Sequence, residues 1–134
     1  MGFVINNFKL DKNKLFFSQG TDGSVLSDFP VKLGGKVESR PLLIPLDLPN
    51  SNTLYIVQLA ADGFIYVIDG LSGCYDKLNI GETSYSMILA DDFNKNGKTD
   101  LLVSTSNGHI FLLSTNADFH PLHAWYIYKS YFEI

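Results

Sequence analysis

The residues best suited to chemistry lie in one nine-residue segment, Asp92–Asp100, which matches the pattern DxNxNGxxD. Oxygen-bearing side chains occupy alternate positions of this segment, and Gly97 permits a sharp bend. A hard cation such as Ca²⁺ takes six to eight oxygen ligands, so the pattern predicts a calcium site. The five expected protein ligands are the side chains of Asp92, Asn94, Asn96 and Asp100 and the backbone carbonyl of Lys98.

Two other interpretations of this segment are open to test. An EF-hand begins in the same way but needs an acidic residue at its twelfth position, which is Val103 here, within a strand-like run. We therefore exclude an EF-hand. A metal-free hairpin, whose carboxylates accept hydrogen bonds from their own loop amides, remains the alternative. With only two carboxylates, and with Lys95 and Lys98 expected to point into solvent, we predict weak binding, with a Kd of about 10⁻⁴–10⁻³ M.

The elements that position this segment belong to an internal repeat. Three turn signals, Asp22-Gly23, Asp62-Gly63 and Asn107-Gly108, have glycines spaced 40 and 45 residues apart. Asp-Gly and Asn-Gly favour type I′ hairpins, and strand-like residues flank each pair. A polar loop precedes each turn at the same offset. Four short strands per repeat of roughly 40–50 residues is the period of a β-propeller blade.

The repeat predicts an all-β fold of about three four-stranded antiparallel sheets, that is, three β-propeller blades at residues 1–36, 37–80 and 81–134. The expected strands include Ser24–Leu26 in the first repeat and Trp125–Tyr128 in the last. A propeller ring needs about four to eight blades, so we expect a fragment of a larger propeller or self-association through unclosed blades. A β-sandwich whose hairpins share this spacing by chance is the alternative.

Loops equivalent to the calcium segment occur in the other two repeats, at Asn7–Leu15 and Asp47–Tyr55. The first contains a single acidic residue, Asp11, and the second has Pro49 where a ligand would stand. We expect neither loop to bind calcium.

Composition limits the function classes. With 46% hydrophobic and 18% charged residues the chain is globular, and its net charge of −4 gives no basic surface for nucleic acid. Cys74 is the only cysteine, which excludes a disulfide framework and a cysteine-rich zinc site. Residues 1–7 lack the basic stretch and the long apolar core of a signal peptide, so we identify no targeting signal in this sequence.

The calcium segment and its flanks, Ile88–Asn94 and Leu101–Val103, resemble the FG-GAP repeats of integrin α-subunit propellers. The chain more closely resembles plant "defective in exine formation" proteins, through the segments Ile80–Met87 and His120–Trp125. This resemblance covers about residues 20–125, whereas residues 126–134 match nothing in that family. This resemblance implies a calcium-binding propeller of the secretory pathway or cell surface, in a membrane-anchored parent protein. A protein or glycan ligand, as in adhesion, is the expected partner.

Catalysis is not expected. No GxSxG elbow occurs, and the HxxH pair His120 and His123 is interpreted as solvated. Residues 54–69 also resemble blades of quinoprotein propellers, which leaves a quinoprotein-like enzyme or a cofactor-free scaffold as the alternative function. A quinoprotein site needs a stacking Trp and a basic residue, and the chain has only Trp125 and Arg40. We expect His109 on a sheet face, and nothing in the sequence brings Glu82 together with other acid–base groups.

Overall fold

The computed structural model of the chain describes residues 3–6, 13–19, 22–46 and 54–119. Within these ranges the fold is all β, which confirms the predicted class, and no helix occurs there. The described part accordingly contains no helix with the length and apolar character that a membrane span requires. The strands are β1 (Phe3–Asn6), β2 (Lys14–Gln19), β3 (Val31–Lys32), β4 (Leu42–Pro45), β5 (Leu54–Leu59), β6 (Phe64–Asp69), β7 (Tyr75–Asn79), β8 (Leu89–Asp91), β9 (Lys98–Ser104) and β10 (Ile110–Asp118).

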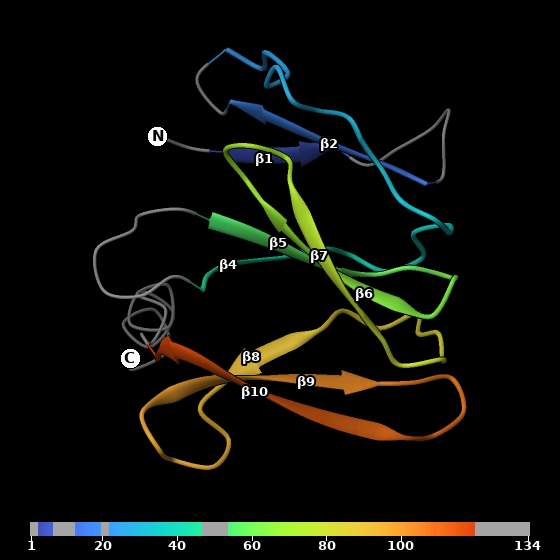
Figure 1. The fold of residues 1–134 in the computed structure, drawn as a ribbon, viewed down its shortest axis with the longest axis vertical. Coiled ribbons are helices and arrows are strands. Elements are labelled where there is room, and N and C mark those ends of the chain that lie inside the picture. Colours follow the sequence, from blue (N-terminus) through green and yellow to red (C-terminus); the bar gives the residue numbers. More distant parts are fainter. Residues whose placement is uncertain (1–2, 7–12, 20–21, 47–53, 120–134) are drawn as a thin grey trace, which may run out of the picture.

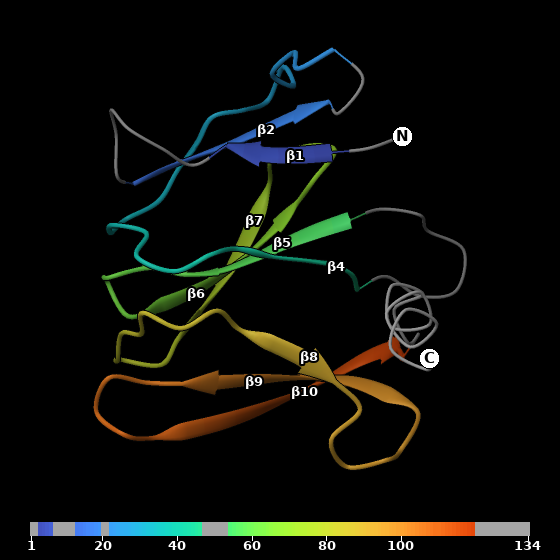
Figure 2. The same ribbon diagram turned by 180° about the vertical axis from the view of Figure 1, so that it is seen from behind.

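The strands form three antiparallel sheets in which sequence neighbours pair. The first sheet has the order β1-β2-β3, the middle sheet β4-β5-β6-β7 and the third sheet β10-β9-β8. The three sheets are stacked one above another along the long axis of the molecule (Figure 1), and the view from behind shows the same order (Figure 2). Four strands are present in the middle sheet, whereas the described residues supply three to each of the other two.

Two of the predicted hairpin turns are found where the repeat places them. Asp62-Gly63 connects β5 to β6, and Asn107-Gly108 connects β9 to β10. The predicted type I′ geometry is wrong, because it needs positive φ at both central residues, and only Gly63 (82°) and Gly108 (85°) have it. Each glycine N–H instead bonds the carbonyl three residues earlier at 3.1 Å, as in three-residue hairpin loops.

The middle and third repeats share one strand register. Val57 lies opposite Val67 in the middle sheet, and Leu102 lies opposite Leu112 in the third sheet. Each residue of the second pair lies 45 residues after its counterpart, the same offset that separates the two turn glycines. The two central hairpins are therefore equivalent residue by residue.

The first repeat departs from the prediction. Residues 24–26, expected as a strand, do not form one, and β3 pairs directly with β2. The Asp22 carboxylate accepts hydrogen bonds from the Ser24 amide (2.9 Å) and hydroxyl (2.7 Å), and the Phe29 amide bonds the Leu26 carbonyl (3.0 Å). These local bonds favour successive turns over an extended strand. The predicted fourth strand of the third repeat, at residues 125–128, lies outside the described residues.

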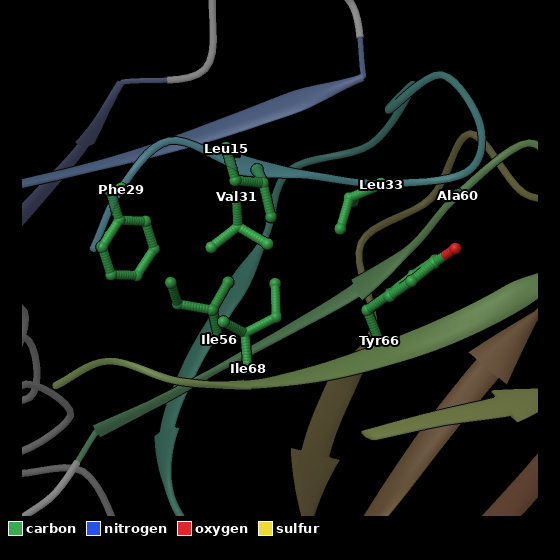
Figure 3. Packing of buried hydrophobic residues seen from close by; sticks show 8 residues of the cluster. All are labelled: Leu15, Phe29, Val31, Leu33, Ile56, Ala60, Tyr66 and Ile68. Carbon is green, nitrogen blue, oxygen red and sulfur yellow. The ribbon is translucent and has the colours of Figure 1, made fainter. Parts of the chain in front are cut away.

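The first core fills the space between the first and middle sheets. Figure 3 shows the first-repeat side chains pointing towards Ile56 and Ile68 of the middle sheet. At one side of this core the Tyr66 hydroxyl donates to the Asp62 carboxylate (2.6 Å) and accepts from the Gly34 amide (3.0 Å). Its buried members are Leu15, Phe29, Val31, Leu33, Ile56, Ala60, Tyr66 and Ile68.

The second core lies between the middle and third sheets. Successive side chains of a strand point to opposite faces of its sheet, so every second residue of each strand faces the other sheet. Each fully buried aliphatic side chain contributes about 1.5–3 kcal/mol, so this core holds the third sheet, and with it the predicted calcium segment, against the middle sheet. Its buried members are Val57, Leu59, Ile65, Ile88, Leu101 and Val103.

Candidate metal centre

The predicted calcium segment connects β8 to β9 at one end of the third sheet. β8 ends at Asp91 and β9 begins at Lys98, so Lys98 and Asp100 lie within a strand rather than in the loop that the sequence suggested. Asp91 and Asp100 are paired in register across the two strands. This pairing closes the segment and places Asp100 directly beside its beginning.

Alternate side chains of the loop fold back over its own backbone. The two carboxylate oxygens of Asp92 accept hydrogen bonds from the amides of Asn96 (3.0 Å) and Gly97 (2.8 Å). The side-chain oxygen of Asn94 accepts from the Asn96 amide (3.1 Å), and that of Asn96 accepts from the Lys98 amide (2.9 Å). The tight bend also needs positive φ, which Gly97 (82°) supplies without strain. Three of the four expected ligand side chains are thus gathered at one short loop, and the fourth, Asp100, lies next to it in β9.

Asp100 is the residue that distinguishes this loop from an ordinary hairpin. Its side chain is fully buried (0% exposed), and its Oδ2 accepts hydrogen bonds from the amides of Phe93 (3.1 Å) and Asn94 (3.3 Å). Its Oδ1 is buried and has no hydrogen-bond partner. Leaving a buried acceptor unsatisfied costs about 1–3 kcal/mol, and more when the group is charged. A bound cation would give this oxygen the partner that the protein does not provide.

The residues present fit a calcium ion by donor chemistry. Every expected ligand is an oxygen, and carboxylate, amide and carbonyl oxygens are the donors that Ca²⁺ takes. Among the described residues there is no group of three or more His, Cys, Asp and Glu side chains that could hold a metal. The loop does not form such a group, because two of its four side-chain donors are asparagines. Soft or imidazole-preferring metals are therefore not favoured at this site.

The C-terminal end of β10 contacts the loop and the start of β9. The Phe119 amide bonds the Gly97 carbonyl (3.0 Å), and the Lys98 ammonium forms an ion pair with Asp118. Both side chains are exposed, so the Lys98 ammonium lies at the surface, where it is paired with a carboxylate on the neighbouring strand. This pairing reduces the repulsion that a cation bound at the loop would meet from Lys98.

No protein-family model matches the chain, and no curated protein matches it. The resemblance to FG-GAP repeats therefore depends on the loop pattern and on the repeat.

Other predicted positions fall outside the described residues. These are the two loops expected not to bind calcium, for residues 7–12 and 47–53, and the histidines and tryptophan of residues 120–125. Arg40 is described and is exposed.

A second polar cluster, which the sequence did not predict, joins the linker after β7 to the β9–β10 hairpin. Glu82 contacts the His109 ring nitrogen Nδ1 at 2.6 Å and accepts a hydrogen bond from the Thr105 hydroxyl at 2.5 Å. The Ser106 amide donates to the Thr83 carbonyl beside them at 2.8 Å. The Thr105 bond, with His109 adding to it, lowers the pKa of the Glu82 carboxyl. Glu82 and His109 are 27 residues apart, so only the tertiary fold brings them together.

Replacing Glu82 with glutamine is expected to reduce stability at neutral pH and to have no effect in acid. A carboxyl whose pKa is lowered on folding stabilises the protein above its unfolded pKa, and that contribution disappears as pH falls through the lower folded value. The melting temperatures of wild type and Glu82→Gln should therefore differ at pH 7, begin to approach each other below the ordinary Glu value of about 4.3, and converge once the pH falls below the lowered folded pKa. Glu38→Gln, at an exposed position, is the control. A difference that is the same at both pH values would contradict this role.

Proposed function

We propose that the chain is a non-catalytic, calcium-binding module of the FG-GAP β-propeller type. In this proposal the third repeat binds one calcium ion through the side chains of Asp92, Asn94, Asn96 and Asp100 and the Lys98 carbonyl, with water completing the shell. The observation that carries it is the buried, unpartnered oxygen of Asp100 at the end of a DxNxNGxxD loop.

The arrangement of the loop supports a structural role for the ion. The two carboxylates, Asp92 and Asp100, come from opposite ends of the segment and repel each other when no cation is present. A divalent ion between them cancels this repulsion and fixes β8 against β9. The ion would therefore supply stability and a rigid loop, with no reaction to catalyse.

The stacked sheets support the propeller part of the proposal. Two consecutive repeats share turns and register, and each sheet buries one face against the next, as propeller blades do. The first repeat is the exception, because residues 24–26 do not form its expected third strand. Three sheets fall short of the roughly four to eight that close a ring, so the proposal includes either a larger propeller of which these are three blades or closure by self-association.

Adhesion or another protein or glycan interaction at the cell surface or in the secretory pathway is the function that fits such a module. The lumen and the extracellular space hold calcium near the weak affinity expected here, about 10⁻⁴–10⁻³ M. No nucleic acid partner is proposed, because the net charge is −4. The quinoprotein alternative gains no supporting contact among the described residues.

Calcium is expected to raise the melting temperature of the full chain in a saturable way. An ion that binds only the folded state stabilises it by RT ln(1 + [Ca]/Kd), about 1.4 kcal/mol at ten times Kd. Asp92→Ala should lose this increment, because it removes one of the two carboxylates. Magnesium should produce a smaller shift, since its strict octahedron suits an adaptable loop poorly.

Asp22→Ala is the matched control for this titration. Asp22 also accepts hydrogen bonds from its own turn, so its loss weakens a comparable local structure without touching the calcium loop. The control should keep the full calcium increment whatever its starting stability. A melting temperature that stays flat up to several times 10⁻³ M calcium, in wild type and variants alike, would show that the loop is a metal-free hairpin.

A further inference from the structure

The chain contains two Asn-Gly pairs, one at each end of β9 (Figure 1). Asn96-Gly97 lies in the calcium loop, Asn107-Gly108 lies in the next hairpin, and both asparagines are exposed to solvent. An asparagine before a glycine can lose its side-chain amide without an enzyme. The glycine nitrogen attacks the side-chain carbon, and a residue without Cβ leaves that approach open. The two pairs therefore share one intrinsic chemistry and differ in the groups around them.

The groups around Asn96 are those that this reaction needs. The Gly97 N–H, whose nitrogen would attack, donates to Asp92 Oδ2 at 2.8 Å. A carboxylate at that distance can accept the proton as the new bond forms. Asn96 Oδ1, where negative charge would develop, accepts a hydrogen bond from the Lys98 amide at 2.9 Å. A backbone N–H in this position stabilises a developing oxyanion, as it does in acyl-transfer enzymes.

The surroundings of Asn107 are different. The Gly108 N–H donates to the Thr105 carbonyl at 3.1 Å, and a carbonyl oxygen is a far weaker proton acceptor than a carboxylate. The nearby carboxylate, that of Glu82, is hydrogen-bonded to the Asn107 side chain instead of to the glycine amide. Asn107 is therefore an internal reference for Asn96 in the same folded chain.

We propose that Asn96 is a site of spontaneous deamidation in the calcium-free loop. The Gly97 nitrogen forms a bond to Asn96 Cγ while its proton passes to Asp92. The tetrahedral intermediate then expels the side-chain nitrogen, which takes up that proton and leaves as ammonia. Water opens the resulting five-membered succinimide ring. Attack at Cγ gives aspartate, and attack at the main-chain carbonyl gives isoaspartate, so water is the only co-reactant.

Calcium should control this reaction, an expectation that rests on the proposed calcium site. An ion bound there would hold Asp92 and Asn96 through the oxygens that the reaction uses, and the Asp92 carboxylate could no longer accept the Gly97 proton. Conversion of Asn96 to aspartate would add a third carboxylate to the donor set, and the number of charged ligands is one property that tunes calcium affinity. Metal-free protein would thus change its calcium affinity as it ages.

The deamidation itself is tested on the full chain, incubated at neutral pH in a chelator, with amide loss at both asparagines followed by peptide mass spectrometry. In the folded chain Asn96 should convert at least tenfold faster than Asn107, a modest part of the roughly 10²–10⁴-fold that a positioned acid or base contributes in enzymes. In denaturant the two should convert at similar rates, because a glycine follows each. A folded chain in which Asn96 is no faster than Asn107 overturns the proposal.

Asp92→Asn tests the proton acceptor. It should bring the Asn96 rate in the folded chain down towards the Asn107 rate, because an amide oxygen cannot take up the proton as a carboxylate does. Asp69→Asn is the matched control, since Asp69 accepts an amide hydrogen bond in a turn of another sheet, and it should change neither rate. An Asn96 rate that stays the same or rises in Asp92→Asn contradicts the assigned role.

The same incubation in calcium separates this inference from the proposed function, with the melting temperature of the same samples reporting whether calcium binds. We expect a raised melting temperature together with slower conversion of Asn96 and an unchanged rate at Asn107. A raised melting temperature without protection of Asn96 overturns the control by calcium. If calcium does not bind, the proposed function fails, and the comparison of the two asparagines in chelator still decides whether the loop promotes its own deamidation.

Discussion

Replacing Ile65 with alanine is expected to destabilise the chain by about 2–5 kcal/mol, the range measured for large-to-small changes in cores. Ile65 is 1% exposed and belongs to the core between the middle and third sheets. The cavity left behind would lie between two sheets that are held by their own hairpins and cannot close around it freely. For a domain with a total stability of roughly 5–15 kcal/mol this is a large loss.

The matched control is the same substitution at the equivalent position of the next repeat. Ile110 follows its hairpin turn as Ile65 does, but its side chain is exposed, so Ile110→Ala should change stability by no more than about 0.5 kcal/mol. Both variants are measured by denaturant unfolding at a protein concentration low enough to keep the chain monomeric. Equal losses at the two positions would show that the middle and third sheets do not pack through this core.

The fold was most predictable where local chemistry and tertiary packing agree. The Asp-Gly and Asn-Gly pairs of the second and third repeats mark turns between strands whose alternate residues are buried, and both hairpins form. The turn type was not predictable from the dipeptide alone, because the preceding residue joins the loop and only the glycine takes positive φ. In the first repeat the Asp22 turn and the Phe29 turn compete with an extended strand, and the sequence pattern did not reveal which would prevail.

Replacing Asp100 with asparagine is expected to distinguish a calcium-binding loop from a metal-free hairpin. Without calcium, the asparagine oxygen can still accept from the Phe93 and Asn94 amides, and the variant no longer buries a charge with an unpartnered oxygen. We therefore expect it to be at least as stable as wild type in a chelator. With calcium at ten times Kd, wild type should gain about 1.4 kcal/mol and the variant little of it.

The control for this change is Asp69→Asn in the middle repeat. Asp69 accepts a hydrogen bond from the Leu71 amide (2.8 Å) in a turn of similar chemistry, and it lies in a different sheet from the calcium loop. Its asparagine variant should gain as much from calcium as wild type does. If Asp100→Asn changes the free energy of unfolding by the same amount with and without calcium, the Asp100 carboxylate does not bind the ion. Its role is then limited to accepting hydrogen bonds from the Phe93 and Asn94 amides.

The ligand pattern of the site could be predicted, but its surroundings could not. Alternating Asp and Asn residues with a glycine are visible in the sequence, and the loop does fold over its own amides as such residues do. The burial of Asp100 depends on β9 beginning at Lys98, and the Lys98–Asp118 pair depends on the register of β10. The Glu82–His109 contact likewise joins segments far apart in the chain. These features follow from sheet pairing, which local sequence does not encode.

The most direct test of the calcium site is the free energy of unfolding of wild type and Asp100→Asn, each measured in a chelator and in about 10 mM calcium, roughly ten times the weakest Kd expected. Calcium should stabilise wild type by at least about 1.4 kcal/mol through binding linkage. The order of stability of the two proteins should also reverse between the two conditions. Equal stability of wild type in chelator and calcium would contradict the proposed site and leave the segment Asp92–Asp100 an ordinary hairpin.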